Sequence, residues 1–207
     1  MRFKYPRTPH LPWSKKVTDD DIIGNIPFKD QEVVVTRKMD GENFTGHTDG
    51  SHARSPDSRY HPSRDWSRGW WAQRAWQIPK GWRVSCENLY AQHSLRYNDL
   101  DSYVLGFAVW DDTLTCLSWD DTQAFFQTMD IVSVPVLWRG IWDEKTIQNL
   151  WDEEDAKTHE GYVVRSAKAF HFDDFAQNVR KFVRPNHVTT DTHWMHQEVV
   201  PNGLKEQ

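Results

Sequence analysis

Short segments rich in β-branched and aromatic residues recur from Glu32 to Val183, separated by turn signals and short helical patterns. Asp49-Gly50 is typical of a hairpin turn between two of them. The sequence predicts strands at 32–37, 43–48, 51–54, 82–89, 103–110, 113–117, 131–138, 161–165 and 179–183. Because strands outnumber helices and are scattered among them, we expect an α+β domain with antiparallel sheets.

Helical spacing of aromatic and apolar residues predicts helices at 66–76, 119–129 and 143–151. Asp65 precedes the first helix, and Ser118 with Asp121 forms a capping box before the second. No linker interrupts the chain between Glu32 and Arg184. We therefore expect residues 1–207 to form a single domain, with an irregular N-terminal arm at 1–30 and a short C-terminal tail at 185–207.

The formal net charge of -5 argues against nucleic-acid binding through bulk positive charge, but it leaves room for a local basic groove. The 2 cysteines are too few for a disulfide framework or a four-thiolate zinc site. No segment resembles a signal peptide, and the longest apolar run, at 103–110, is far too short to span a membrane. We expect a cytoplasmic protein without a membrane partner.

Lys38-Met39-Asp40-Gly41-Glu42-Asn43, at the end of a predicted strand, is the sharpest motif. A lysine before a glycine that permits an unusual turn can be held at the floor of a pocket. The same residues also fit a polar β-turn. Asp40 and Glu42 by themselves would raise the pKa of the lysine, so a nucleophilic role requires cations from elsewhere in the chain.

Three later strands carry charged residues in otherwise apolar surroundings. Glu87 lies within Ser85–Tyr90, and Glu160 precedes the strand Gly161–Arg165. In Val179–Arg184 the alternation places Lys181 and Val183 on one face. Each fragment alone also fits a solvated sheet edge or an ion pair at a rim. Their order along the chain is more specific than any one of them.

Lys-x-Asp-Gly-x-Asn, Glu-Asn-Leu-Tyr, an aromatic strand, Glu-Gly-Tyr-Val-Val-Arg and Lys-Phe-Val-Arg, in this order, resemble the motifs of the covalent nucleotidyltransferase superfamily. That superfamily comprises ATP-dependent RNA and DNA ligases and capping enzymes, and the detail is most similar to the RNA ligase 2 branch. The resemblance covers Val33 to Arg184. It implies a nucleotidyltransferase (ATP-grasp-like ligase) domain, with antiparallel β-sheets flanked by helices.

The resemblance implies that Lys38 is the catalytic nucleophile, which takes AMP from ATP as a phosphoramidate. Lys181 would be the matching cation that lowers its pKa, and Glu160 would lie near Lys38 and help to place Mg2+ or Mn2+. Eight positions would bind the nucleotide by resemblance: Lys38, Asn43, Arg54, Glu87, Phe107, Glu160, Lys181 and Arg184.

Among these, Glu87 would hold the ribose hydroxyls and Phe107 would stack on the adenine, with Trp110 as the alternative on the opposite strand face. Arg54 would contact the nucleotide or the accepting RNA end. The chain departs from the pattern at Arg37, where the branch often has a glutamate, and at Arg184, where many members have a second lysine. We expect no appended C-terminal OB or helical domain after Arg184.

The resemblance predicts an ATP-dependent RNA ligase that joins RNA 3′-OH and 5′-phosphate ends, with RNA repair as its biological role. The alternatives are a GTP-dependent capping-type guanylyltransferase and a non-catalytic RNA-end-binding protein. Cations among tryptophans fit an RNA surface and, equally, a packed helix with a solvated rim. These residues are Arg59, His61, Arg64, Trp66, Arg68, Trp70 and Trp71.

Overall fold

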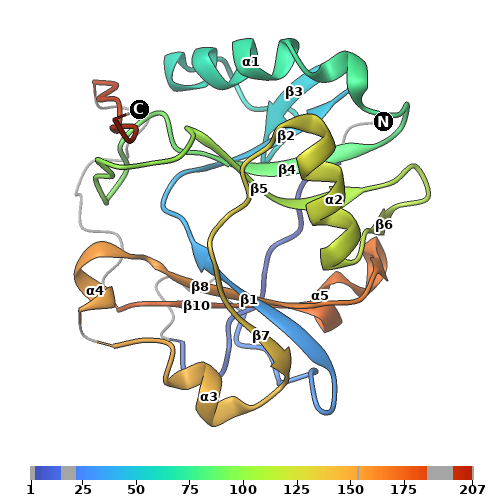
Figure 1. Ribbon diagram of the computed structural model, residues 1–207, viewed down its shortest axis with the longest axis vertical. Helices are drawn as coiled ribbons and strands as arrows, with labels where there is room; N and C mark the ends of the chain where they lie inside the picture. Colours follow the sequence, from blue (N-terminus) through green and yellow to red (C-terminus); the bar gives the residue numbers. More distant parts are fainter. Residues whose placement is uncertain (1–2, 15–21, 153, 186–197, 207) are drawn as a thin grey trace.

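The strands form two antiparallel sheets, one of four strands and one of six, in the computed structural model of residues 3–14, 22–152, 154–185 and 198–206. Figure 1 shows the four-stranded sheet in the lower half of the molecule and the six-stranded sheet in the upper half, with helices at the periphery. The predicted α+β class with antiparallel sheets is confirmed.

The smaller sheet has the strand order β10-β8-β1-β7. Its strands are β1 (Glu32–Lys38), β7 (Val136–Ile141), β8 (Gly161–Ser166) and β10 (Val179–Val183). Val33, Val34 and Val35 of β1 are all fully buried, because apolar clusters cover both faces of this sheet. A run of consecutive buried valines is typical of a strand covered on both faces.

The larger sheet has the order β3-β2-β4-β5-β6-β9. Its strands are β2 (Glu42–His47), β3 (Gly50–Ala53), β4 (Arg83–Asn88), β5 (Val104–Trp110), β6 (Thr115–Cys116) and β9 (Phe170–His171). The predicted hairpin forms, with Gly50 as the first residue of β3 opposite His47. β9 was not expected, because two residues are too few to show any periodicity.

The helices are short: α1 (Asp65–Ala72), α2 (Trp119–Met129), α3 (Glu144–Gln148), α4 (Asp155–Thr158) and α5 (Phe175–Asn178). Single 3-10 turns add Pro62–Arg64, Ala75–Gln77 and Phe172–Asp174. Ser118 caps α2 by accepting a hydrogen bond from the Asp121 amide, as predicted. The helices predicted at 66–76 and 143–151 are both shorter than expected.

The strand predicted at 131–138 is misplaced, because regular pairing begins only at Val136. Residues before it cross from one sheet to the other, and Val134 donates its amide to Gly106 of β5. Pro135 follows and has no amide to give to a ladder, although its carbonyl accepts from Arg37. β7 therefore starts later than its hydrophobic residues indicate.

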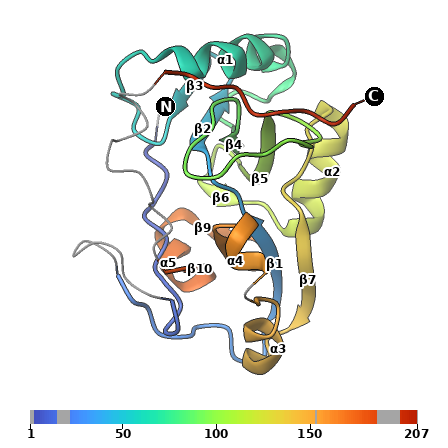
Figure 2. The same cartoon turned by 90° about the vertical axis from the view of Figure 1, so that its left-hand side faces the viewer.

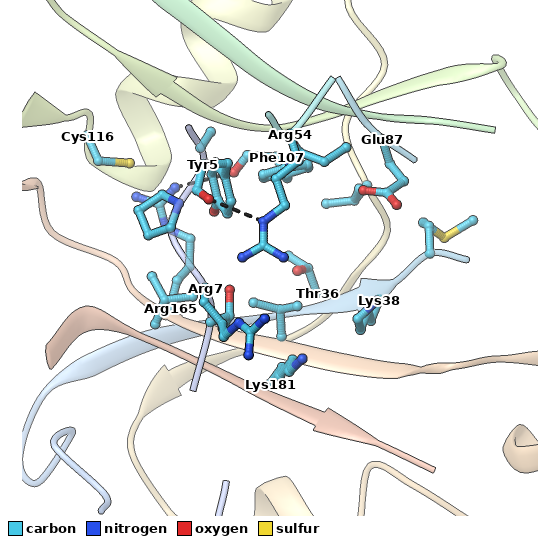
Figure 3. Close-up of a pocket in the computed structure, with 18 of the residues that line it drawn as sticks. Tyr5, Arg7, Thr36, Lys38, Arg54, Glu87, Phe107, Cys116, Arg165 and Lys181 are labelled. Atoms are coloured by element: carbon cyan, nitrogen blue, oxygen red, sulfur yellow. Dashed lines mark hydrogen bonds between the residues drawn. The ribbon is translucent and has the colours of Figure 1, made fainter. Parts of the chain in front are cut away.

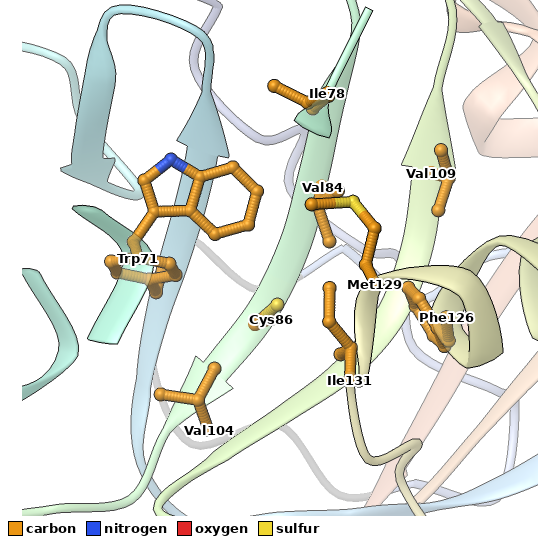
Figure 4. Packing of buried hydrophobic residues seen from close by; sticks show 10 residues of the cluster. Trp71, Ile78, Val84, Cys86, Val104, Val109, Phe126, Met129 and Ile131 are labelled. Atoms are coloured by element: carbon orange, nitrogen blue, oxygen red, sulfur yellow. The ribbon is translucent and has the colours of Figure 1, made fainter. Parts of the chain in front are cut away.

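Four apolar clusters form the cores. One lies between the six-stranded sheet and helices α1 and α2, with Trp71, Phe126 and Met129 against the strands (Figure 4). Another covers the outer face of the four-stranded sheet, and the remaining two lie between the sheets. Every described tryptophan except Trp76 belongs to one of these clusters or packs on it. The abundant tryptophan therefore serves mainly as core.

The described part of the C-terminal tail docks beside the loop that follows β4. The Asn202 side chain is buried, donates to the Leu89 carbonyl at 2.7 Å and accepts from the Tyr97 amide at 2.9 Å. Figure 2 shows this segment running along the upper part of the molecule near α1. No helix in the described ranges has the length and hydropathy needed to cross a membrane.

Candidate active site

A cavity of about 350 Å³ is lined by both sheets and by residues 5–8 of the N-terminal arm (Figure 3). Six of the residues expected from the motifs line it together: Lys38, Asn43, Arg54, Glu87, Phe107 and Lys181. Glu160 reaches this group through Lys38, whereas Arg184 is not among the lining residues. The motifs therefore converge on one site although they come from six different strands or strand ends.

Lys38 forms an ion pair with Glu160, and its Nζ lies 2.6 Å from Glu160 Oε2. The pairing of β1 with β8 sets this contact, because Lys38 lies opposite Gly161, the residue after Glu160. A Cβ at Gly161 would lie 2.0 Å from the Phe182 carbonyl oxygen of β10. Glycine is thus required where three strands meet beneath the lysine.

The loop after Lys38 is held by its own aspartate. Asp40 Oδ2 accepts a hydrogen bond from the Leu95 amide at 2.7 Å, and the Asp40 amide donates to the Tyr97 hydroxyl at 3.0 Å. The expected role of Gly41 in an unusual turn is wrong, since its φ is not positive. A Cβ there would lie 2.5 Å from the Asn88 carbonyl, so glycine is needed for a close approach to β4.

Asn43 and Glu87 lie opposite each other across β2 and β4. Asn43 Oδ1 is buried and has no hydrogen-bond partner within the described protein, which leaves an acceptor at the cavity. Arg54, at the end of β3, projects toward the same space, and its Nε donates to the Tyr5 carbonyl at 3.3 Å. Polar groups from three neighbouring strands therefore face one side of the cavity.

Phe107 and Trp110 both line the cavity, but only Phe107 retains partial exposure. Trp110 is buried among Phe170, Phe172 and Phe175. This difference favours Phe107 as the ring that a planar ligand could reach. The tryptophan fills the core behind it.

Comparison with known proteins gives the site its context. The family model for RNA ligase matches residues 31–183. The chain belongs to the RNA ligase family. A search of curated proteins found no match.

Solved structures of Naegleria gruberi RNA ligase share the fold. Its complex with pyrophosphate superposes with a TM-score of 0.57 at 17% identity, covering 79% of this chain and 52% of that one. A lysine-to-alanine variant solved with ATP and manganese gives a TM-score of 0.55 at 15% identity, covering 78% and 52%. The chain spans about half the length of these structures, and the expected nucleotidyltransferase fold is confirmed.

The motifs did not indicate several residues that line this cavity. Arg165 lines the cavity, is buried, and donates to the carbonyl groups of Leu117 and Ser166. Arg165 is the last residue of the motif that begins at Glu160, but the sequence analysis predicted no role for it. Tyr5 and Arg7 of the N-terminal arm lie outside the matched region, and nothing in the arm's proline-rich sequence indicated that it returns to the cavity.

The charges at the Lys38 end are mostly negative. Burial raises the pKa of Glu87 to about 8, with Glu160 and Asp40 adding to the rise against the opposing effect of Lys38. Burial and Glu160 raise the pKa of Asp40 to about 6. For Lys38, burial lowers the pKa, but Glu160 and Glu87 outweigh it and the net shift is upward. The charged groups of the protein itself raise the pKa of Lys38, so the expectation that neighbouring cations lower it is wrong.

Glu160 and Glu87 could bind a divalent ion that takes only one or two of its ligands from the protein. No group of three or more potential metal-ligating side chains occurs within the described ranges. Magnesium is commonly held by one or two carboxylates together with substrate phosphates, so a dedicated cage is not required. Glu160 and Asp40 add to the raised pKa of Glu87 beside a single lysine, which is the charge imbalance that a cation would relieve.

The segment expected to be either an RNA surface or a packed helix contains both buried and exposed residues. Trp71 is 1% exposed and donates its indole N–H to the His47 carbonyl, so it belongs to the core. Arg64 forms a two-bond ion pair with Glu42. Arg59 and Arg68 are exposed and line a second cavity of about 230 Å³ that adjoins Asn43.

The raised pKa of Glu87 predicts a pH-dependent contribution to stability. The unfolded chain loses this proton near pH 4.5 and the folded protein near pH 8, so the wild-type free energy of unfolding falls as pH rises through that window. Glu87→Gln removes the effect. We expect its stability relative to wild type to increase from pH 5 to pH 8, by at most about 1.4 kcal/mol per pH unit.

Urea unfolding of both proteins at several pH values measures this difference. Glu198→Gln, at an exposed position, is the matched control, and its free energy of unfolding should change with pH as that of wild type does. If the free energy of unfolding of Glu87→Gln also changes with pH as that of wild type does, the fold does not hold the Glu87 carboxyl protonated.

Proposed function

We propose that the protein is an ATP-dependent RNA ligase that joins RNA 3′-OH and 5′-phosphate ends through lysyl-AMP and RNA-adenylate intermediates. The observation that carries this is the Lys38–Glu160 pair at 2.6 Å in a cavity shared with Lys181 and Arg54. An amine nucleophile beside phosphate-binding cations is what adenylyl transfer requires. Membership of the RNA ligase family supports RNA as the substrate.

In the first step Lys38 Nζ attacks the α-phosphorus of ATP. A P–N bond forms, the P–O bond to the β-phosphate breaks, and pyrophosphate leaves. The amine must give up a proton, and Glu160 Oε2 is in hydrogen-bond contact to accept it. Because the carboxylates raise the pKa of Lys38, a bound divalent cation that offsets their charge would favour the reactive amine.

In the second step an oxygen of the RNA 5′-phosphate attacks the AMP phosphorus, and the P–N bond to Lys38 breaks. In the third, the RNA 3′-hydroxyl attacks the 5′-phosphorus and AMP leaves. Glu160, with Glu87 nearby, would hold Mg2+ or Mn2+, which would offset negative charge on the phosphates. A Naegleria gruberi RNA ligase structure contains AMP and manganese, which supports this cofactor set.

The remaining roles follow the positions in the cavity. Phe107 would stack on adenine, and Glu87 would bind the ribose hydroxyls. Asn43 and Arg54 would bind the nucleotide or the accepting RNA end, because an amide acceptor and a guanidinium lie together there. Arg184, whose amide donates to the Glu160 carbonyl, would steady Glu160 and act as a cation at the rim.

The RNA path would run over the second cavity. Arg59 and Arg68 supply exposed positive charge there, and Tyr60 presents an exposed ring at the same cavity. Asn43 borders both cavities, so a strand bound at the second would have its end at the first. We further propose that residues 1–207 act as one adenylyltransferase domain, with a cytoplasmic role in RNA repair.

Replacing Lys38 by alanine should abolish covalent labelling by ATP, because Lys181, another amine that lines the cavity, lies two strands away from the position of Lys38. The measurement is incubation with labelled ATP and magnesium or manganese, followed by denaturing electrophoresis. Wild type should give a labelled band that disappears in excess chelator.

Lys38→Arg serves as the matched control for folding, since it keeps a positive charge beside Glu160 but should not form the covalent AMP adduct. Labelling of either variant would remove Lys38 from the nucleophile role. Labelling of wild type by GTP in place of ATP would favour a guanylyltransferase. No labelling by either nucleotide would favour a non-catalytic RNA-end-binding protein.

The RNA path predicts a separate phenotype for the Arg59→Ala/Arg68→Ala double variant. Sealing of a pre-adenylated RNA strand should fall at least tenfold and lose part of its salt dependence, because phosphate contacts release counterions on binding. Labelling of Lys38 by ATP should be unchanged. Lys80→Ala, exposed and away from both cavities, is the control. Equal sealing by the double variant and the control would place the RNA elsewhere.

A further inference from the structure

The N-terminal arm ties the two sheets together at the cavity. Near its far end the Leu11 amide donates to the Lys181 carbonyl at 2.8 Å, and the Lys181 amide donates to the Pro9 carbonyl at 3.0 Å. Before that the chain crosses to the other sheet, where the amide of Tyr5 donates to the carbonyl of Arg54 at 3.3 Å. The arm therefore fixes the backbone at two of the cations of the site.

Aromatic packing sets the register of the crossing segment. The Tyr5 ring meets Phe107 and Phe175 edge to face, with centroid separations of 5.4 Å in each case. Two residues earlier, the Phe3 ring packs beneath the Arg83 guanidinium at 4.4 Å. With these rings anchored, residues 5–8 are held as one wall of the cavity rather than as a loose end.

Arg7 projects from this wall into the space between Arg54 and Lys181 (Figure 3). Burial lowers the pKa of the Arg54 guanidinium, and the charge of Arg7 lowers it further, so the two cations face one another closely enough to repel. Like charges gathered in a cavity are costly until an anion lies between them. The arm thus adds positive charge at the end of the cavity away from the carboxylates.

The position suits the part of the nucleotide that leaves. Lys181 lies opposite Val163, and Val163 opposite Thr36, so Lys181 is displaced from Lys38 by two residues along the strand direction, about 7 Å, and by two strand positions across the sheet. We propose that Arg7, with Arg54 and Lys181, binds the β- and γ-phosphates of the nucleoside triphosphate and the pyrophosphate they become. This rests on the proposed function and assigns a nucleotide contact to a segment outside the family match.

A guanidinium offers paired hydrogen bonds to phosphate and stabilises the charge that develops on the leaving pyrophosphate. The arm-borne contact would therefore act on the triphosphate and on pyrophosphate, but not on a nucleoside that lacks phosphates. That selectivity separates a phosphate contact from a general loosening of the cavity.

The test measures binding of ATP, inorganic pyrophosphate and adenosine by titration calorimetry, with protein first treated with pyrophosphate and magnesium to remove any bound AMP. Arg7→Ala should weaken binding of ATP and of pyrophosphate about tenfold and leave adenosine binding unchanged. Arg7→Lys should recover part of the loss. Lys4→Ala removes the same charge from an exposed position on the arm and should bind all three like wild type.

Equal binding by Arg7→Ala and Lys4→Ala would overturn the inference, as would a matching loss of adenosine affinity in Arg7→Ala. Failure of the proposed function looks different, because wild type would then not become labelled by ATP. Labelled wild type with an unaffected Arg7→Ala would remove the arm from the site and leave the ligase assignment intact.

Discussion

The contact between Lys38 and Glu160 is the constraint on which the rest of the site depends. A partly buried ammonium beside a buried carboxylate is stable only if the geometry is good and the remaining polar atoms find partners. Strand pairing supplies that geometry, because β1 and β8 bring Lys38 opposite Gly161 and β10 approaches the same glycine from its other side. The pairing of strands in the four-stranded sheet therefore positions Lys38 and Glu160 for their ion pair.

The cavity is polarised along its length. Asp40, Glu87 and Glu160 gather around Lys38, whereas Arg7, Arg54 and Lys181 lie toward the arm. A triphosphate and a divalent ion carry the charges that complement these two ends. Under the proposed function, charge complementarity would orient the nucleotide with the reacting phosphorus near the lysine and the leaving group toward the cations.

Local patterns predicted most of the strands and the cap of α2. Ser118 and the Asp49-Gly50 hairpin depend on neighbours in sequence, and both form where expected apart from a small shift of the turn. The motif order supplied Lys38 and Lys181 through resemblance, and the fold brings them into one cavity. The individual roles of these residues stay predictions.

Long-range contacts account for what could not be predicted. The late start of β7 follows from the crossing before Pro135, and the need for Gly41 follows from the Asn88 carbonyl on another strand. Arg64 was expected on an RNA surface or a solvated rim and instead pairs with Glu42, a partner distant in sequence. Tyr5 gives no periodic signal at all, because its place is set by the rings of Phe107 and Phe175.

The most direct measurement is to map the adenylylated residue. Wild-type protein would be incubated with ATP and magnesium, digested under conditions that preserve phosphoramidates, and its peptides sequenced by mass spectrometry. The proposal predicts AMP on Lys38 alone, since this amine pairs with Glu160 at the carboxylate end of the cavity. AMP on Lys181, or a protein that carries no AMP after turnover conditions, would contradict the account.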